Sequence, residues 1–171
     1  IEERRLSAHV IGGGEPRGIC GSGLVDAAAR ALELGLLLPN GKLLENPLPL
    51  AGSVALTQSD VRQLQLAKGA MAAGLKMIAR EASRLRLAGA FGNYLHLGSA
   101  RRIGLLPEDV EVEPAGNAAL RGARMLLLEP STRQQRIERI LAMTEHVELA
   151  ADPQFEEIFA ESMRLAPYRL R

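Results

Sequence analysis

The amino-acid sequence predicts an α/β fold, in which short apolar strands alternate with amphipathic helices. The apolar run 86–90 ends in small residues beside a Gly-Asn turn, as a strand often does before a helix. The run Ser59–Ala82 repeats apolar residues at helical spacing. Three glycine-containing turns, Arg17–Gly23, Leu87–Asn93 and Ala115–Gly122, each lead from an extended or apolar segment into a turn or helix.

The composition is that of a small globular domain with an aliphatic core. The 171 residues are 47% hydrophobic but only 3% aromatic, enough for one large domain or two small lobes. A net charge of +1 argues against a nucleic-acid surface, which needs clustered basic residues. The single cysteine excludes an internal disulfide and fits a reducing, cytoplasmic location. No apolar run approaches the ~20 residues of a membrane span. Because the chain begins with Ile1, we expect a longer parent protein.

The N-terminal part is predicted to contain a strand, a glycine turn and a helix. Ala8–Ile11 has the pattern of a short strand before three glycines, but the last glycine of a dinucleotide-binding fingerprint is missing. A helix is expected over Leu24–Leu36. The preceding Gly21, Ser22 and Gly23 suit an anion at a helix N-terminus, whereas Ser22 can equally be a simple N-cap. Cys20 is interpreted as a small buried residue rather than a catalytic thiol.

The middle of the chain is dominated by one long predicted helix. A connector over Leu37–Leu50, with a hairpin around Asn40-Gly41, leads to a strand at Ser53–Leu56. Thr57 and Asp60 have the spacing of a capping box, which starts the helix Ser59–Ala82. The expected buried face of this helix comprises Val61, Leu64, Met71, Leu75, Ile78 and Ala82, and the opposite face comprises Arg62, Gln65, Lys76 and Arg80.

Lys68 breaks the helix pattern because it lies within the apolar stripe, four residues after Leu64 and three before Met71. A lysine in this position either extends its ammonium group to water or meets a negative partner. A nucleotide is one such partner, and Gln65, one turn earlier, would flank it. Both interpretations stay open from the sequence.

The second half of the chain continues the alternation. The Leu87–Asn93 strand and turn are followed by a short helix Ser99–Ile103, with Ser99 as N-cap and Gly104 as its stop. A strand over Val110–Glu113 is expected to end at Pro114, and Asn117 to cap a helix over Ala118–Leu128. Two further helices, Ser131–Glu145 and Pro153–Arg164, the second with Asp152 as its N-cap, flank a link at Val147–Leu149 that could pair with a sheet edge.

Three backbone-exposed turns and one lysine on an apolar face together suggest a nucleotide cleft. The sequence shows no clear general base, no paired acids at metal spacing and no nucleophile–histidine–acid set. His9, His96 and His146 lie far apart in the sequence. We therefore predict no catalytic residue and no metal ligand.

Four ordered segments resemble one protein family. They are Arg17–Asp26 (RGICGSGLVD), Leu56–Val61 with Leu64–Lys68 (LTQSDV and LQLAK), Leu87–Asn93 (LAGAFGN) and Gly116–Ala119 (GNAA). They are similar to the reductive activators of corrinoid proteins, whose C-terminal domain belongs to the ASKHA superfamily of sugar kinases, actin and heat-shock chaperone ATPases. The likeness extends over essentially the whole chain.

The resemblance implies that residues 1–171 form the second lobe of an ASKHA-type domain, a mixed sheet flanked by helices with a helical tail over 129–171. It implies a parent protein with an N-terminal [2Fe–2S] ferredoxin domain, which uses ATP to drive an electron onto cobalt(II) of a corrinoid protein. The implied partner is a corrinoid iron–sulfur protein or the corrinoid protein of a methyltransferase. One cysteine cannot hold the cluster, so this fragment alone is expected to be inactive.

The resemblance also implies a site for ATP or ADP with Mg²⁺, shared with the lobe that is missing here. Its cofactor-binding residues would be Gly89, Ala90, Phe91, Gly92 and Asn93 of the adenosine motif, Gln65 and Lys68 beside adenine and ribose, Gly116 and Asn117 near the hinge, and Gly21, Ser22 and Gly23 at the cleft wall. Two alternatives are a phosphotransferase of the same superfamily that acts on a small metabolite, and a non-catalytic module that forms a homodimer through the C-terminal helices.

Overall fold

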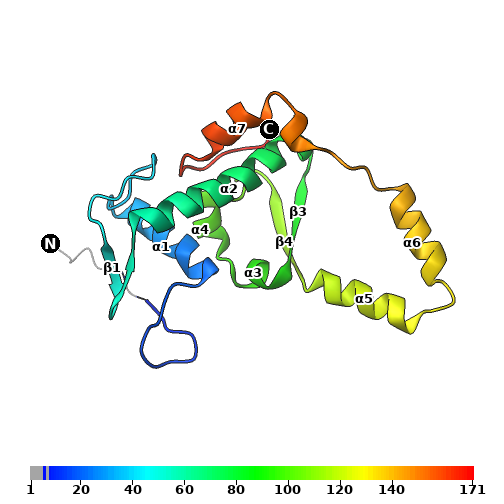
Figure 1. Ribbon diagram of the computed structural model, residues 1–171, viewed down its shortest axis with the longest axis horizontal. Coiled ribbons are helices and arrows are strands. Elements are labelled where there is room, and N and C mark those ends of the chain that lie inside the picture. Colours follow the sequence, from blue (N-terminus) through cyan, green and yellow to red (C-terminus); the bar gives the residue numbers. More distant parts are fainter. Residues whose placement is uncertain (1–5, 7) are drawn as a thin grey trace.

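The computed structural model describes Leu6 and residues 8–171, and it confirms the α/β class (Figure 1). The elements in chain order are α1 (Gly21–Glu33), β1 (Leu48–Ala51), β2 (Val54–Leu56), α2 (Gln58–Ile78), β3 (Arg84–Ala88), α3 (Gly89–Tyr94), α4 (Leu97–Arg102), β4 (Glu111–Gly116), α5 (Ala118–Leu128), α6 (Arg133–Ala142), the 3-10 helix η1 (Leu149–Ala151) and α7 (Phe155–Ser162). None of these helices is both long and apolar enough to cross a membrane.

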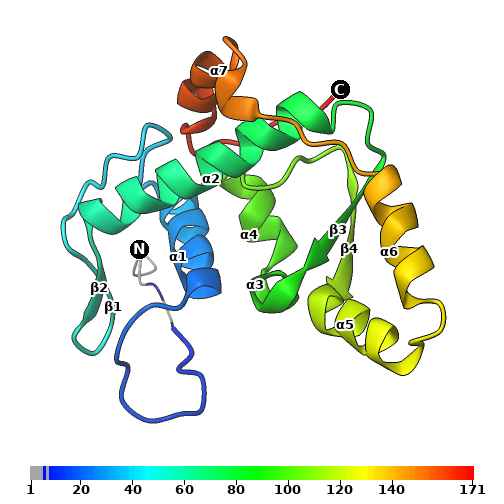
Figure 2. The same ribbon diagram turned by 45° about the vertical axis from the view of Figure 1, so that its right-hand side comes forward.

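The long helix α2 crosses the molecule and separates two packed layers. Figure 2 shows α1 and α4 on one side of α2 and α7 on the other. The main core lies where α1, α2 and α4 meet and is built from small and aliphatic side chains. Its most buried members include Val25, Ala28, Ala31, Leu37, Leu56, Val61, Ala100, Ile103, Leu106 and Leu165. Because aromatic residues are scarce, tight packing of Ala against Leu and Val supplies most of the apolar burial.

The N-terminal segment differs from the prediction. The strand expected over Ala8–Ile11 is wrong, since residues 8–10 have no regular structure and Ile11 lies in a turn. Gly12, Gly13 and Gly14 all have positive φ angles of 75–83°, which curl the chain into a loop instead of extending it.

Two helix caps also differ from those expected. The Cys20 Sγ atom accepts the backbone N–H of Gly23 at 3.3 Å, so α1 begins at Gly21 and Ser22 lies within its first turn. His96 rather than Ser99 caps α4, because its Nδ1 atom accepts the Ser99 backbone N–H at 3.2 Å. Cysteine and histidine are uncommon caps, which is why the sequence favoured the serines.

Helix α2 starts as predicted but buries a different face. The capping box between Thr57 and Asp60 is confirmed, with both reciprocal hydrogen bonds formed. Met71 and Ile78, placed on the buried face by the sequence, are 47% and 62% exposed, so that prediction is wrong. Val61 and Leu64 are buried as predicted, but Gln65, which was expected on the opposite face, is buried too. The other buried residues are Lys68, Gly69, Ala72 and Ala73, because α7 and the segment after it pack against this side.

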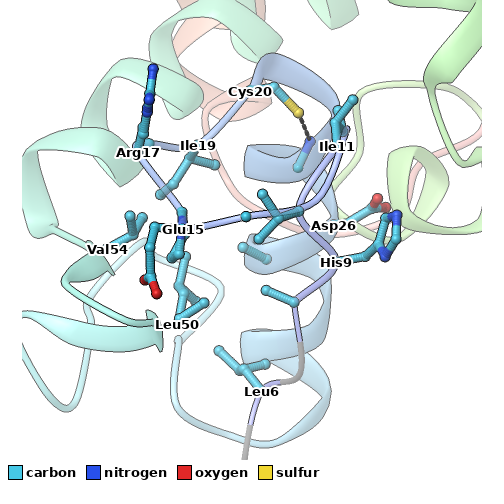
Figure 3. Close-up of a pocket in the computed structure, with 18 of the residues that line it drawn as sticks. Leu6, His9, Ile11, Glu15, Arg17, Ile19, Cys20, Asp26, Leu50 and Val54 are labelled. Atoms are coloured by element: carbon cyan, nitrogen blue, oxygen red, sulfur yellow. Dashed lines mark hydrogen bonds between the residues drawn. The ribbon is translucent and has the colours of Figure 1, made fainter.

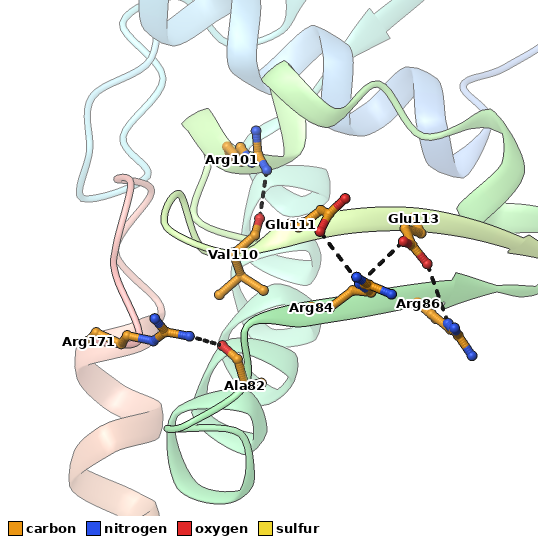
Figure 4. A network of polar contacts seen from close by, with 8 residues as sticks. All are labelled: Ala82, Arg84, Arg86, Arg101, Val110, Glu111, Glu113 and Arg171. Carbon is orange, nitrogen blue, oxygen red and sulfur yellow. Dashed lines mark hydrogen bonds and ion pairs between the residues drawn. The ribbon is translucent and has the colours of Figure 1, made fainter.

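The strands form two separate two-stranded sheets. β1 and β2 are antiparallel, whereas β3 and β4 are parallel and pair from Arg84 with Glu111 to Ala88 with Gly116. Figure 4 shows the ion pairs along β3 and β4, in which Arg84 contacts Glu111 and Glu113. β4 continues through Pro114 to Gly116, beyond the predicted end. Proline fits there because β4 pairs with one strand among the described residues and does not need every N–H of its ladder.

The hairpin predicted around Asn40-Gly41 is confirmed by an isolated antiparallel bridge between Leu37 and Leu43. The turn is closed by the Asn40 side chain, whose Oδ1 atom accepts the Lys42 backbone N–H at 3.0 Å. This turn lies against the C-terminal segment, because the Leu165 backbone N–H donates to the Pro39 carbonyl at 2.8 Å.

The tail after Leu128 is less regular than predicted. α6 covers Arg133–Ala142 only, and α7 begins at Phe155 with Gln154 as N-cap, although Asp152 still accepts the Gln154 backbone N–H. The predicted link at Val147–Leu149 pairs with no strand of the described residues, and Leu149 starts the helix η1. Helices α5 and α6 have no buried residue, and Figure 1 shows them extending away from α2.

Lys68 connects α2 to the C-terminal segment. The side chain is only 2% exposed, and its Nζ atom donates hydrogen bonds to the carbonyls of Gly104 and Arg164. Burial lowers the pKa of Lys68 to about 8, with repulsion from Lys76 as the second cause. Burial, together with the negative charge of Asp109, raises the pKa of Tyr168 to about 12.

The shifted pKa values of Lys68 and Tyr168 make the free energy of unfolding vary with pH in the alkaline range. Between pH 8 and about 10.5, Lys68 has lost its proton in the folded chain but keeps it in the unfolded chain, so the free energy of unfolding rises with pH. The raised pKa of Tyr168 reverses this trend above pH ~10. We predict that Lys68→Met removes a rise of up to about 1.4 kcal/mol per pH unit from urea unfolding measured between pH 8 and 10. Lys42→Met, in an exposed turn, is the matched control and should keep the rise. Equal slopes for the two variants would contradict the assignment.

Candidate functional site

Two of the three glycine turns meet at the carboxyl end of the parallel sheet. Ala88, the last residue of β3, pairs with Gly116, the last residue of β4, so the two chain segments leave the sheet side by side. Gly89 and Gly116 have φ angles of +88° and +63°, which L residues adopt only with strain. A Cβ atom added at either glycine would meet no atom within 4 Å, so space lies over both backbones. In open α/β sheets, ligands bind at this end of the strands.

The third glycine turn reaches the same end of the sheet through Phe91. A Cβ atom on Gly21 would lie 3.2 Å from the Phe91 ring, so the first turn of α1 packs directly on α3. Figure 2 shows the first turns of α1, α3 and α5 along the same side of the molecule. The structure thus brings together ten of the twelve residues predicted to bind a cofactor: Gly21, Ser22, Gly23, Gly89, Ala90, Phe91, Gly92, Asn93, Gly116 and Asn117.

Polar side chains at these turns mainly shape the helix ends. Asn117 caps α5 as predicted, with its Oδ1 atom accepting the Leu120 backbone N–H at 2.9 Å. Gly92 lies against β3, because a Cβ there would approach the Leu87 Cβ to 3.1 Å. Asn93 is exposed to solvent. The arrangement offers backbone that a ligand can approach closely rather than a set of reactive side chains.

Gln65 and Lys68 lie apart from these turns, on the face of α2 that holds the C-terminal segment. The Gln65 amide donates to the carbonyls of Asn40 and Met163, and its oxygen accepts from Arg62 at 2.7 Å. Lys68 has neither of the two partners considered from the sequence, water or an anion, because it donates to two backbone carbonyls. A nucleotide could contact either side chain only if these hydrogen bonds were released. Their role in nucleotide binding stays a prediction.

Cys20 is exposed, so its interpretation as a small buried residue is wrong. Its Sγ atom lies 3.5 Å from the Ser22 Oγ and accepts the Gly23 backbone N–H. The hydrogen bond with Ser22, followed by that from Gly23, lowers the pKa of the Cys20 thiol. A free cysteine at the start of α1 was visible in the sequence, but its exposure depends on the course of residues 8–19.

Beside the first turn of α1 lies a cavity of about 740 Å³ that sequence reasoning missed. It is enclosed by the irregular residues 8–19, by α1 and by the β1–β2 hairpin, and Leu50 and Val54 contribute apolar lining (Figure 3). Cys20 stands at its rim, with the Sγ hydrogen bond drawn as a dashed line in Figure 3. No sequence signal marks this cavity because irregular backbone builds one of its walls.

The described residues offer no complete ligand set for the metal groups that the resemblance implies. Within residues 8–171 no three His, Cys, Asp or Glu side chains lie close enough to hold a metal ion. A single cysteine likewise cannot ligate an iron–sulfur cluster. The glycine turns do fit a nucleotide, whose phosphates and ribose need close approach to backbone N–H groups.

The lowered thiol pKa gives a direct test of the geometry around Cys20. We predict that iodoacetamide alkylates this cysteine with a pH midpoint below that of a free thiol measured under the same conditions. Ser22→Ala removes the largest cause of the shift and should move the midpoint upward. Ser53→Ala is the control and should leave it unchanged. Because the chain has one cysteine, mass spectrometry reports the rate without ambiguity. A midpoint equal to that of the free thiol, both in the unaltered protein and in Ser22→Ala, would contradict the hydrogen-bonded cap.

Comparison with known proteins places these features in one family. A family model described as the C-terminal domain of RACo, the ASKHA domain, matches residues 1–170. The chain is 34% identical over 197 residues to the corrinoid activation enzyme RamQ of Eubacterium limosum, a match that covers 92% of this chain and 33% of RamQ. It is 32% identical over 161 residues to the [Co(II) methylated amine-specific corrinoid protein] reductase of Methanosarcina barkeri, covering 86% of this chain and 29% of the reductase.

A solved structure agrees with these matches. A reductive activator for corrinoid, iron–sulfur protein superposes with a TM-score of 0.79 and 27% sequence identity, over 96% of this chain and 32% of the activator. The chain thus spans about a third of the length of the relatives it matches. From the match over residues 1–170, we conclude that the chain belongs to the family of the C-terminal ASKHA domain of RACo.

Proposed function

We propose that this chain is the nucleotide-binding lobe of an ATP-dependent reductive activator of a corrinoid protein. The convergence of three glycine turns at the carboxyl end of the β3–β4 pair is the observation that carries the proposal. Two relatives that act on corrinoid proteins by their names, and a solved activator with the same fold, support it. The cytoplasm is the proposed location, and a corrinoid iron–sulfur protein or the corrinoid protein of a methyltransferase is the proposed partner.

Each of the three turns would contribute contacts to the bound nucleotide. Gly89 and Gly116 have open space above their backbones, so phosphate or ribose oxygens can approach the chain closely. The helices α1 and α5 begin at two of these turns, and the N–H groups of a helix N-terminus favour negative charge. Mg²⁺ ligands would come from the other lobe. In the whole protein, ATP supplies the free energy for an uphill electron transfer from a [2Fe–2S] centre to cobalt(II).

Helices α5 and α6 with the residues between them (118–142) form an arm that starts at the candidate site. This connection suggests how nucleotide binding would affect the partner protein. α5 begins directly after Gly116 and Asn117, and no residue of α5 or α6 is buried against the rest of the chain. The direction of this arm therefore depends on the backbone of the turn that the nucleotide would contact. ATP could in this way favour one docking arrangement with the corrinoid protein, without any reactive side chain from this lobe.

A second candidate function is a non-catalytic interaction module. Exposed apolar side chains on and after the two arm helices favour it, among them Leu120, Leu127, Leu128, Ile140, Leu141, Met143 and Val147. Such faces usually mark contact surfaces, here for a second copy of the chain or for the partner. This role is compatible with nucleotide binding. The phosphotransferase alternative has no such observation in its favour.

The nucleotide role can be tested with two matched glycine variants. We predict that Gly89→Ala in the complete gene product weakens ATP binding at least tenfold, because the new methyl group lies where the backbone must approach the ligand. Gly35→Ala is the control, since Gly35 also has a positive φ (+68°) and open space but follows α1 far from the site. Both variants should lose about 1 kcal/mol of stability from backbone strain. Isothermal titration calorimetry measures the affinities, and equal ATP affinity in the two variants would contradict the proposed site.

The activator role needs a separate assay under anaerobic conditions. We predict that the complete gene product, once reduced, converts cobalt(II) of its corrinoid partner to cobalt(I) only when ATP is present. Visible absorption follows both the corrinoid and the bands of a [2Fe–2S] centre. Reduction at the same rate without ATP would refute the proposal, and a protein that stays colourless after iron and sulfide are supplied would favour the phosphotransferase.

A further inference from the structure

The few aromatic side chains of this protein are distributed unevenly. The chain has three Phe and two Tyr. Phe155 and Phe159 stack on each other in α7 with ring centroids 5.9 Å apart, and Tyr168 is largely buried in the C-terminal segment. The two that remain, Phe91 and Tyr94, are 44% and 77% exposed, and both belong to the short helix α3 at the candidate site.

Exposing two aromatic side chains costs free energy unless something covers them. Residues three apart on a helix lie on the same side, so Phe91 and Tyr94 are neighbours on the surface of α3. Both lie within a few residues of Gly89, where the backbone is open to a ligand. A partly exposed ring beside an open glycine turn is a suitable surface for a planar group.

We infer that the nucleobase of the bound nucleotide stacks on the ring of Phe91. The inference rests on the proposed nucleotide site and adds to it the residue that receives the base. Gly21 packs against one edge of the ring, because a Cβ atom at Gly21 would lie 3.2 Å from the nearest Phe91 ring carbon. One edge of the ring thus contacts the first turn of α1, and Tyr94, three residues further along α3, is more exposed.

Stacking also determines how selective the site is. Two polar side chains at the three turns already interact at the start of a helix. Asn117 caps α5, and the Ser22 Oγ atom lies 3.5 Å from the Sγ atom of Cys20, which caps α1. Among the ten residues of these turns, Asn93 is the other polar side chain, so the side chains of this lobe offer few hydrogen bonds to the edge of a base. Every purine has a similar aromatic face, so the site should bind ATP and GTP with affinities within about threefold of each other.

The test compares nucleotide with bare triphosphate in the complete gene product. Stacking of one base contributes roughly 5- to 150-fold in affinity. Phe91→Leu keeps an apolar contact with Gly21 but removes the aromatic face, so ATP should bind about tenfold more weakly while inorganic tripolyphosphate binds as before. Phe91→Trp should retain the affinity for ATP. Phe155→Leu, which removes an aromatic ring far from the site, is the matched control and should change neither ligand.

Each outcome decides between distinct accounts. An equal loss of ATP and tripolyphosphate affinity in Phe91→Leu would show that Phe91 only maintains the fold, and would overturn the inference. Unchanged ATP affinity in that variant would place the base elsewhere and also overturn it. If the unaltered protein binds tripolyphosphate but prefers ATP over GTP by a hundredfold, stacking does not dominate recognition. If it binds neither ATP nor tripolyphosphate, the proposed nucleotide function itself fails.

Discussion

Parallel pairing of β3 with β4 is the constraint on which the rest of the site depends. Parallel strands end at the same edge of a sheet, and the register that pairs Ala88 with Gly116 therefore brings two glycine turns together from positions 28 residues apart. α3 and α4 make the crossover that this pairing requires. The first turn of α1 joins them through Gly21, where an added Cβ atom would lie 3.2 Å from the Phe91 ring. A shift of the β3–β4 register by one residue would move Gly89 away from Gly116 and disrupt the candidate site.

A second set of contacts holds the C-terminal segment and is physically distinct from the glycine turns. Gln65 and Lys68 donate to carbonyls of Met163 and Arg164, and the Asp109 carboxylate accepts the backbone N–H groups of Leu170 and Arg171 at 3.0 Å. These side chains replace the strand or helix partners that an irregular segment lacks. The buried Lys68 therefore has a structural role in this arrangement. The side of α2 that binds the C-terminal segment is distinct from the glycine turns, where the backbone is open to a ligand.

Local signals in the sequence were sufficient for the elements that depend on local chemistry. The capping box of α2, the Asn117 cap of α5 and the hairpin at Asn40-Gly41 all follow from hydrogen bonds within a few residues, and they were predicted. The unusual position of Lys68 within an apolar stripe was also visible from helical periodicity, although its burial was left open. The glycine pattern identified the three turns that the structure then brings together. Gln65 and Lys68, which were also predicted beside the nucleotide, lie apart from these turns.

Features that depend on distant segments could not be read in the same way. Met71 and Ile78 looked buried because apolar spacing cannot tell which side α7 will cover. The caps at Cys20 and His96 follow from how the preceding loops approach their helices, not from residue preference. The partner of the Lys68 ammonium lies 96 residues away, so no pattern around the lysine could name it.

The most direct test of this account is the hydrogen exchange of backbone amides in the complete gene product, with and without ATP. The account predicts that ATP slows exchange in the first turns of α1, α3 and α5, around residues 21–24, 89–93 and 117–120, while the amides of α2 near Lys68 change little. Protection confined to α2 and the segment after α7, with none at the glycine turns, would contradict it. That pattern would indicate that the nucleotide binds near Gln65 and Lys68 and that the glycine turns have only a structural role.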